Sequence, residues 1–158
     1  MRERLRRNRF LVVGRAGLDL YADPPGTEIE NANGFLAALG GSAANIAVAI
    51  AQQRGTSALL SAVSDDAVGR YTTTALANYG VVTTHVKIVG GETRNSLAVV
   101  ETRVENCQSV IYRNGAADFE VSEADACAVD YSDFAAVIAT GTGLAREPSR
   151  GATLKALM

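Results

Sequence analysis

Short apolar runs and helix-forming stretches alternate along the first part of the chain. Residues 10–13 (FLVV) and 56–63 (TSALLSAV) are apolar runs of the length expected for strands that are buried on both faces of a sheet. Residues 43–53 and 64–80 are rich in residues that favour helices, and each stretch follows one of the apolar runs. The order strand, helix, strand, helix predicts a parallel sheet with crossover helices, as in α/β proteins.

Polar residues and glycine mark the expected ends of these helices. Ser42 is the expected N-cap of the first helix, and Ser64 or Asp65 begins the second. Gly80 is the expected stop of the second helix, because glycine readily adopts the left-handed conformation that ends many helices. Between the first strand and the first helix, an extended piece ends near Tyr21 and leads into a turn region.

The pattern changes after residue 82. Residues 83–89, 95–103 and 108–113 are short β-branched runs without a helical period, separated by polar residues and glycine. Three such runs in succession predict an antiparallel meander inserted into the α/β chain. We expect this insert, residues 83–113, to form a lid over a site or a surface between subunits, because its strand edges are free to pair.

The α/β pattern returns in the last part of the chain. Ser122 is typical of a helix cap, residues 133–145 are typical of a strand followed by a glycine-rich turn, and Pro148 lies near the first turn of a last helix. The expected organisation is a disordered basic tail at residues 1–9, an α/β core at 10–82 and 114–158, and a lid at 83–113.

The composition fits one globular domain and argues against several classes of protein. Hydrophobic residues make up 47% of the 158 residues, and a net charge of −2 gives no field that would favour nucleic acid or an anionic membrane. No apolar run reaches the roughly 18 residues of a membrane span. Cys107 and Cys127 match neither a metal-binding spacing nor a disulfide framework, which favours a reducing cytoplasmic location.

Residues 37–50 (ALGGSAANIAVAIA) combine a glycine turn with a helix start. The stretch lacks the lysine and the spacing of a Walker phosphate loop, and it lacks the spacing of a dinucleotide-binding loop. Gly40 and Gly41 instead allow a ligand to approach the backbone, while Ser42 and Asn45 offer donors and acceptors. This surface suits a neutral polyol such as a sugar. A tight turn that serves only the fold is the alternative.

Asp19 follows the first strand, where a carboxylate can accept hydrogen bonds from two neighbouring hydroxyl groups; a turn aspartate is the alternative. Next come the G-G-x-x-x-N turn at 40–45, the D-D-x-x-G segment at 65–69 and the β-stranded insert. In this order the chain resembles the N-terminal half of the PfkB family of ribokinase-like carbohydrate kinases, from Phe10 to Met158. Within the family, stretches such as GRAGLDLYADPPGT and CQSVIYRNGAAD are most similar to the kinases of inositol catabolism.

The resemblance implies a set of sugar-binding positions and no metal ligand or catalytic residue within this chain. These positions are Asp19, Gly40, Gly41, Asn45, Tyr112, Arg113, Arg15 and Asn95. Arg113 and Tyr112 are expected to reach the acid or keto end of the substrate, because an arginine fork fits a carboxylate. For Arg15 and Asn95, the alternatives are a surface arginine and a strand-end asparagine.

The activity that the resemblance implies is ATP-dependent phosphorylation of a primary hydroxyl of a keto sugar or sugar acid, with Mg²⁺ bound to the nucleotide. The catalytic base of the family is an aspartate in a G-A-G-D segment, and this sequence has no such segment. We therefore expect a truncated ribokinase-like fold that lacks its second half and is inactive alone.

The expected partners are a small-molecule sugar or sugar acid and a second copy of the chain, which would form a homodimer through the lid; neither nucleic acid nor a membrane is expected. Three alternatives stay open from the sequence. The chain is a non-catalytic kinase-like fragment that binds sugar or dimerises, part of a kinase for 2-keto-3-deoxygluconate, fructose or ribose, or a Rossmann-type nucleotide-binding domain.

Overall fold

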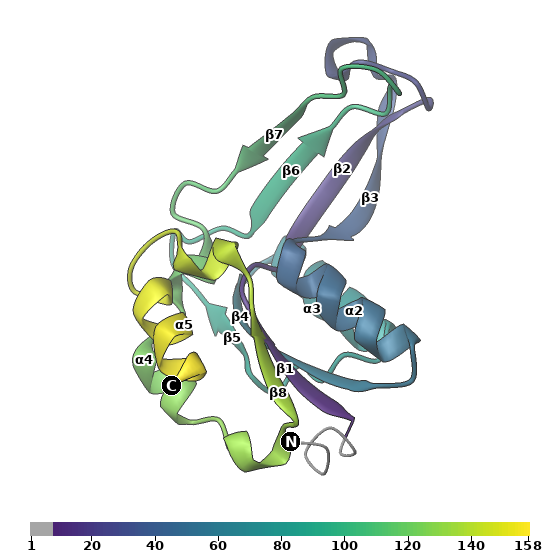
Figure 1. Cartoon of the computed structure of the whole chain (residues 1–158). Helices are drawn as coiled ribbons and strands as arrows, with labels where there is room; N and C mark the ends of the chain where they lie inside the picture. Colours follow the sequence, from purple (N-terminus) through teal and green to yellow (C-terminus); the bar gives the residue numbers. More distant parts are fainter. Residues whose placement is uncertain (1–7) are drawn as a thin grey trace.

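The computed structural model describes residues 8–158, which form two four-stranded sheets (Figure 1). The first sheet has the strand order β5-β4-β1-β8, and its neighbouring strands are all parallel. Its strands are β1 (Arg9–Val13), β4 (Thr56–Ser64), β5 (Val86–Val89) and β8 (Ala136–Ala139). The second sheet has the order β3-β2-β6-β7 and projects from one end of the first (Figure 1). Its strands are β2 (Gly17–Asp23), β3 (Gly34–Gly40), β6 (Ser96–Val100) and β7 (Ser109–Tyr112).

Helices cover both faces of the first sheet (Figure 1). They are α2 (Ser42–Gln52), α3 (Ala67–Asn78), α4 (Glu123–Cys127) and α5 (Ser149–Leu157). Val12 and Leu59 pack against α2 and α3, whereas Leu11, Val13 and Leu60 pack against α4 and α5. Successive residues of a strand point to opposite faces, so a strand covered on both faces is apolar without interruption. The predicted parallel sheet with crossover helices is confirmed.

Short 3-10 helices occupy some of the connections. Within the described residues they are η1 (Ile29–Asn31), η2 (Ala117–Glu120), η3 (Tyr131–Asp133) and η4 (Gly141–Leu144). Two of them, η2 and η4, lie next to the candidate site described below. Both are too short to be recognised from a sequence period.

The expected boundaries of the lid, residues 83–113, need correction. β5 was expected in the insert, but it pairs in parallel with β4 and belongs to the first sheet. β2 and β3 belong to the second sheet, although they precede the expected insert by many residues. β2 also pairs in parallel with β6, so the sheet is mixed rather than a simple antiparallel meander. Asp19 pairs with Ala98, which lies far away in the sequence. A local sequence pattern cannot predict pairing between such distant segments.

The observed starts of α2 and α3 differ from the expected ones by one or two residues. Gly41, with φ of 102°, occupies the N-cap position of α2, and Ser42 is already helical. The N-cap of α3 is Asp66 rather than Ser64 or Asp65. Asp66 accepts hydrogen bonds from two backbone N–H groups at the helix start, and this satisfies donors that otherwise have no partner in the helix.

Two other predicted helix ends are confirmed. Gly80 follows the last residues of α3 with φ of 84°, a conformation that glycine adopts without steric cost. Ser122 caps α4 in a capping box, in which it exchanges hydrogen bonds with Asp125.

The expected basic tail lies mostly outside the described residues, which begin at Asn8, and Arg9 already belongs to β1. From residue 8 onward, the structure has no helix of the length and apolar character needed to cross a membrane.

The pKa of Asp66 reflects its role at the start of α3. Burial raises this pKa, but hydrogen bonds from the Gly69 N–H, the Ser64 hydroxyl and the Val68 N–H together lower it below the ordinary value of 3.8. A carboxylate with a lowered pKa stabilises the folded chain above its unfolded pKa, and this stabilisation is lost as the pH falls through the folded pKa.

We therefore expect Asp66→Ala to lower the free energy of unfolding by about 1 kcal/mol at neutral pH, because α3 loses its cap. Asp65→Ala is the matched control, since Asp65 is exposed and is not the N-cap. Urea denaturation should show a gap between the two variants that closes as the pH is lowered below 3.8. Equal losses in both variants would contradict the assignment of the cap.

Candidate functional site

The candidate site lies at the carboxyl ends of β1 and β8, where residues 14–16 lead from the first sheet into β2 (Figure 1). The carboxyl ends of parallel strands form the edge at which open α/β sheets usually bind ligands. The start of α2 lies close by, because β3 ends at Gly40 and the helix begins at Ser42. Its first turn adds backbone N–H groups that have no partner within the helix.

Asp19 and Gly40 pack directly against each other at the base of the second sheet. A Cβ atom on Gly40 would overlap the Asp19 carboxylate, so the carboxylate occupies the space that a side chain at position 40 would need. The Asp19 side chain is only 14% exposed. The absence of a side chain at Gly40 therefore makes room for the carboxylate, which packs against the backbone there.

Arg15 holds Asp19 from the other side. Arg15 is 7% exposed, its Nε donates a hydrogen bond to Ser96 Oγ at 2.8 Å, and its Nη2 lies 3.4 Å from Asp19 Oδ1. The two opposite charges compensate each other where water is largely excluded. Asp19 Oδ2 accepts no hydrogen bond from another described residue, so this oxygen is left for a ligand.

Gly41 brings the start of α2 against the connector between the two sheets. A Cβ atom on Gly41 would overlap the carbonyl group of Arg15, and its φ of 102° also disfavours other residues. The Ala44 N–H donates to the Arg15 carbonyl at 3.3 Å. Asn45 lies in the first turn of α2 and is exposed, so its side-chain amide is available beside Gly41.

Arg113 follows β7 and is bound by several groups. Its Nε donates to Asp118 Oδ2 at 3.1 Å, and its Nη2 donates to the same oxygen and, at 2.7 Å, to the Thr142 carbonyl. The guanidinium carbon lies 4.1 Å from the centre of the Phe119 ring. These contacts connect the end of β7 to η2 and to the turn after β8.

Thr142 connects Arg113 to the rest of the site, and the sequence interpretation did not single it out. Its Oγ1 accepts a hydrogen bond from the Arg15 N–H at 3.2 Å and lies 3.2 Å from Ser42 Oγ and 2.8 Å from Thr140 Oγ1. The T-G-T-G pattern at 140–143 is the signal that could have identified it, because it places two hydroxyls just after a strand. The structure thus brings together Asp19, Gly40, Gly41, Arg15 and, through Thr142, Arg113.

Two sequence-predicted residues lie apart from this group. Asn95 is buried, and its amide accepts from the Ser64 N–H at 3.1 Å and donates to Thr72 Oγ1 at 2.8 Å, so both ends serve the fold. In the strand register, Asp19 aligns with Ile111 through Ala98, so the alternation of side chains puts Tyr112 on the opposite face of the sheet. Ile111 rather than Tyr112 shares the face of Asp19.

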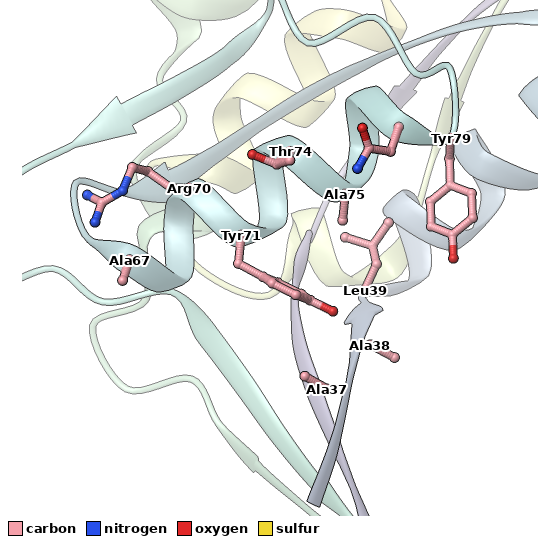
Figure 2. Close-up of a pocket in the computed structure, with 10 residues that line it drawn as sticks. Ala37, Ala38, Leu39, Ala67, Arg70, Tyr71, Thr74, Ala75 and Tyr79 are labelled. Atoms are coloured by element: carbon pink, nitrogen blue, oxygen red, sulfur yellow. The ribbon is translucent and has the colours of Figure 1, made fainter.

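An open groove of about 660 Å³ lies between β3 and α3, on the side of the second sheet away from Asp19. Figure 2 shows the side chain of Tyr71 reaching from α3 toward β3 and Leu39 pointing toward α3, whereas Arg70 points away. Tyr79, which follows the last residue of α3, also lines the groove. The groove combines aromatic and aliphatic residues with the polar residues Arg70, Thr74 and Asn78, and it shares no residue with the group around Asp19.

The chemistry of the group around Asp19 is hydrogen bonding to the uncharged hydroxyl groups of a ligand. It offers one unused carboxylate oxygen, the hydroxyl of Ser42, the amide of Asn45 and the N–H groups of the first turn of α2. Within residues 8–158, no three His, Cys, Asp or Glu side chains are grouped to hold a metal ion. Neighbouring hydroxyl groups of a polyol match this set of donors and acceptors.

Comparison with known sequences places the chain among carbohydrate kinases. Residues 7–158 match the family model described as pfkB family carbohydrate kinase. A 5-dehydro-2-deoxygluconokinase from Photobacterium profundum is 36% identical over 147 residues, which are 93% of this chain and 44% of the relative. A 5-dehydro-2-deoxygluconokinase from Lacticaseibacillus casei is 32% identical over 152 residues, covering 94% of this chain and 46% of the relative. The chain therefore spans about half the length of the curated relatives it matches.

Solved structures show the same fold. An uncharacterized sugar kinase from Pyrococcus horikoshii superposes with a TM-score of 0.80 at 22% identity, covering 93% of this chain and 50% of that chain. The same kinase has also been solved in complex with ATP. A fructokinase from Vibrio cholerae superposes with a TM-score of 0.77 at 27% identity, covering 94% of this chain and 48% of the other. The expected ribokinase-like fold, with a parallel sheet, flanking helices and a separate second sheet, is confirmed.

The contact between Asp19 and Gly40 predicts how the site responds to an added methyl group. Gly40→Ala should lower the free energy of unfolding by about 1–3 kcal/mol, because the carboxylate must move. Gly34→Ala is the matched control on the same strand, since a Cβ atom there meets nothing within 4 Å. Urea denaturation measures both. The loss in Gly40→Ala should shrink when Asp19→Ala is added; a loss independent of residue 19 would place the strain elsewhere.

Proposed function

Because the chain belongs to the pfkB family of carbohydrate kinases, we propose that residues 8–158 bind the sugar in an ATP-dependent kinase that phosphorylates a primary hydroxyl group. The proposed substrate is a keto sugar or sugar acid, specifically 5-dehydro-2-deoxy-D-gluconate in myo-inositol degradation. The names of the two curated relatives support this choice of substrate. The sequence-predicted contacts of Asp19, Gly40, Gly41, Asn45, Arg15 and Arg113 with the sugar are part of the proposal.

The observation that carries the proposal is the position of the Asp19 carboxylate. It is fixed by Gly40 and Arg15, it is largely shielded from water, and its Oδ2 has no hydrogen-bond donor among the described residues. A carboxylate oxygen in such a setting accepts strong hydrogen bonds from hydroxyl groups. Asp19 would thus hold neighbouring hydroxyls of the sugar, while the start of α2 and Asn45 contact the remaining oxygens.

We propose ATP as the phosphoryl donor and Mg²⁺ as the ion on its phosphates. The structural neighbour from Pyrococcus horikoshii that was solved with ATP supports the donor. The ion, when bound, would neutralise charge that develops on the transferred phosphoryl group. No acidic cluster of residues 8–158 is arranged to hold Mg²⁺, so we assign none of these residues to it. Their role is to bind and orient the sugar.

The residues that perform the transfer are proposed to lie outside this sequence. It contains no G-A-G-D segment, and no lysine lies near the Gly40–Gly41 turn. In kinases of this kind, positioning and electrostatic stabilisation around the phosphates supply most of the rate enhancement. We therefore propose that this chain alone is inactive. The cytoplasmic location expected from the sequence also stays a prediction.

We further propose that two copies associate through the second sheet. The face opposite Asp19 carries Leu18, Leu20, Leu97, Val99, Val110 and Tyr112, as the strand registers show. On this apolar face, Val110 is 46% exposed and Tyr112 is 58% exposed, so both side chains are open to solvent. Exposed apolar side chains that share one face of a sheet favour an interface, and a second copy of the same face is the occupant that we propose.

The role of Asp19 is tested in the intact kinase by Asp19→Asn, which keeps the size of the side chain and removes its charge. We expect kcat/KM for 5-dehydro-2-deoxy-D-gluconate to fall at least 100-fold, about 2.7 kcal/mol, because the charged acceptor is lost. Asp23→Asn, at the far end of the same strand, is the control. Full activity of Asp19→Asn would overturn the proposed contact between Asp19 and the sugar. A kcat/KM for fructose that exceeds the one for 5-dehydro-2-deoxy-D-gluconate in the parent enzyme would overturn the proposed substrate.

The proposed dimer is tested by placing a charge on its apolar face. Val110→Asp should convert a dimer into a monomer in light scattering after gel filtration, because an unpaired charge would be buried between the sheets. Leu154→Asp is the control, since Leu154 is exposed to a similar extent on α5. A parent protein that is monomeric at micromolar concentration would rule out this interface.

A further inference from the structure

The Arg113 guanidinium has most of its hydrogen-bonding capacity occupied by the protein itself. Its Nε and Nη2 both donate to Asp118 Oδ2, and Nη2 also donates to the Thr142 carbonyl. A guanidinium grips a carboxylate with two parallel N–H groups from neighbouring nitrogens. With Nε and Nη2 occupied, no such pair of nitrogens is free. Only Nη1, which donates to no described residue, remains for a ligand.

Asp118 cannot itself contact a ligand at the open site. Its side chain is 2% exposed, and it lines a small cavity of about 10 Å³ together with Gly14, Gly143, Ser149 and Thr153. Its Oδ2 holds Arg113, while its Oδ1 has no hydrogen-bond partner within residues 8–158. Asp118 can therefore act on a substrate only through the arginine that it holds.

The Phe119 ring and Thr142 complete the restraint on Arg113. The ring lies against the guanidinium, 4.1 Å from its central carbon, and limits movement out of its plane. The Thr142 carbonyl limits rotation within the plane, and the Thr142 hydroxyl lies beside Arg15 and Ser42 of the sugar site. The orientation of Nη1 is thus fixed from three sides relative to that site.

We propose that Asp118 is a positioning residue that determines specificity, because it leaves Arg113 a single nitrogen, Nη1, to donate to the substrate. The proposal rests on the proposed function, in which Arg113 faces the acid or keto end of the sugar. A single nitrogen suits one acceptor oxygen, such as a keto oxygen, rather than a carboxylate held by two parallel bonds. Asp118 also neutralises the arginine, so recognition depends on direction more than on net charge.

The test is steady-state kinetics of Asp118→Asn in the intact kinase. We expect KM for 5-dehydro-2-deoxy-D-gluconate to rise at least 10-fold, with kcat and KM for ATP within 2-fold of the parent, because Nη1 is no longer held in place. The NMR signal of the Arg113 Nε–H should also lose its protection from exchange with water. Asp133→Asn is the control, because it removes a carboxylate that pairs with Arg9 at the start of β1, the opposite end of that strand from the site.

Loss of one partner of a buried ion pair destabilises a protein, so folding of Asp118→Asn is checked by circular dichroism. If this variant does not fold, Asp118→Glu decides, because it keeps the charge and shifts the carboxylate by one methylene group: a raised KM for the sugar acid supports the proposal, and an unchanged KM overturns it. Arg113→Lys distinguishes the proposed sugar contact of Arg113 from the positioning role of Asp118. An unchanged KM in Arg113→Lys removes Arg113 from the proposed function. A raised KM there with an unchanged KM in Asp118→Asn overturns only the positioning role.

Discussion

The structure depends on the burial of one charged side chain, Arg15, at the joint between its two sheets. Its guanidinium bonds Ser96 of β6 and lies beside Asp19 of β2. Its backbone accepts a hydrogen bond from Ala44 of α2 and donates one to Thr142 after β8. Because a buried charge is tolerated only when it is compensated and hydrogen-bonded, these elements are held in one arrangement. The candidate site is the space that this arrangement leaves open.

The elements that could be predicted are those whose signal is local. β1 and β4 are rich in apolar residues because helices cover both of their faces, and α2 and α3 are stretches of helix-forming residues with recognisable ends. Asp19 and Gly40 were singled out for the same reason, since each lies in a short motif. What the motif did not indicate is that the two residues touch, and that the missing side chain at Gly40 makes room for the carboxylate.

The features that could not be predicted depend on pairing between distant segments. No local pattern shows that β2 joins β6 rather than a strand of the first sheet, or that β5 belongs to the first sheet. The side-chain direction of Tyr112 follows from that pairing, so the sequence also could not show that Tyr112 lies on the other face of the sheet from Asp19. Arg113 was recognised as a candidate ligand, but its restraint by Asp118 and Thr142 appears only when η2 and the turn after β8 are placed beside it.

The contact between Gly40 and Asp19 has a consequence for how related sequences can diverge. Any side chain at position 40 requires the space that the carboxylate fills, so a replacement there is accommodated best together with a smaller residue at position 19. The reverse order is open, since a smaller residue at position 19 leaves room at position 40. The two positions should therefore covary, and lineages that abandon the acidic group should lose it before the glycine.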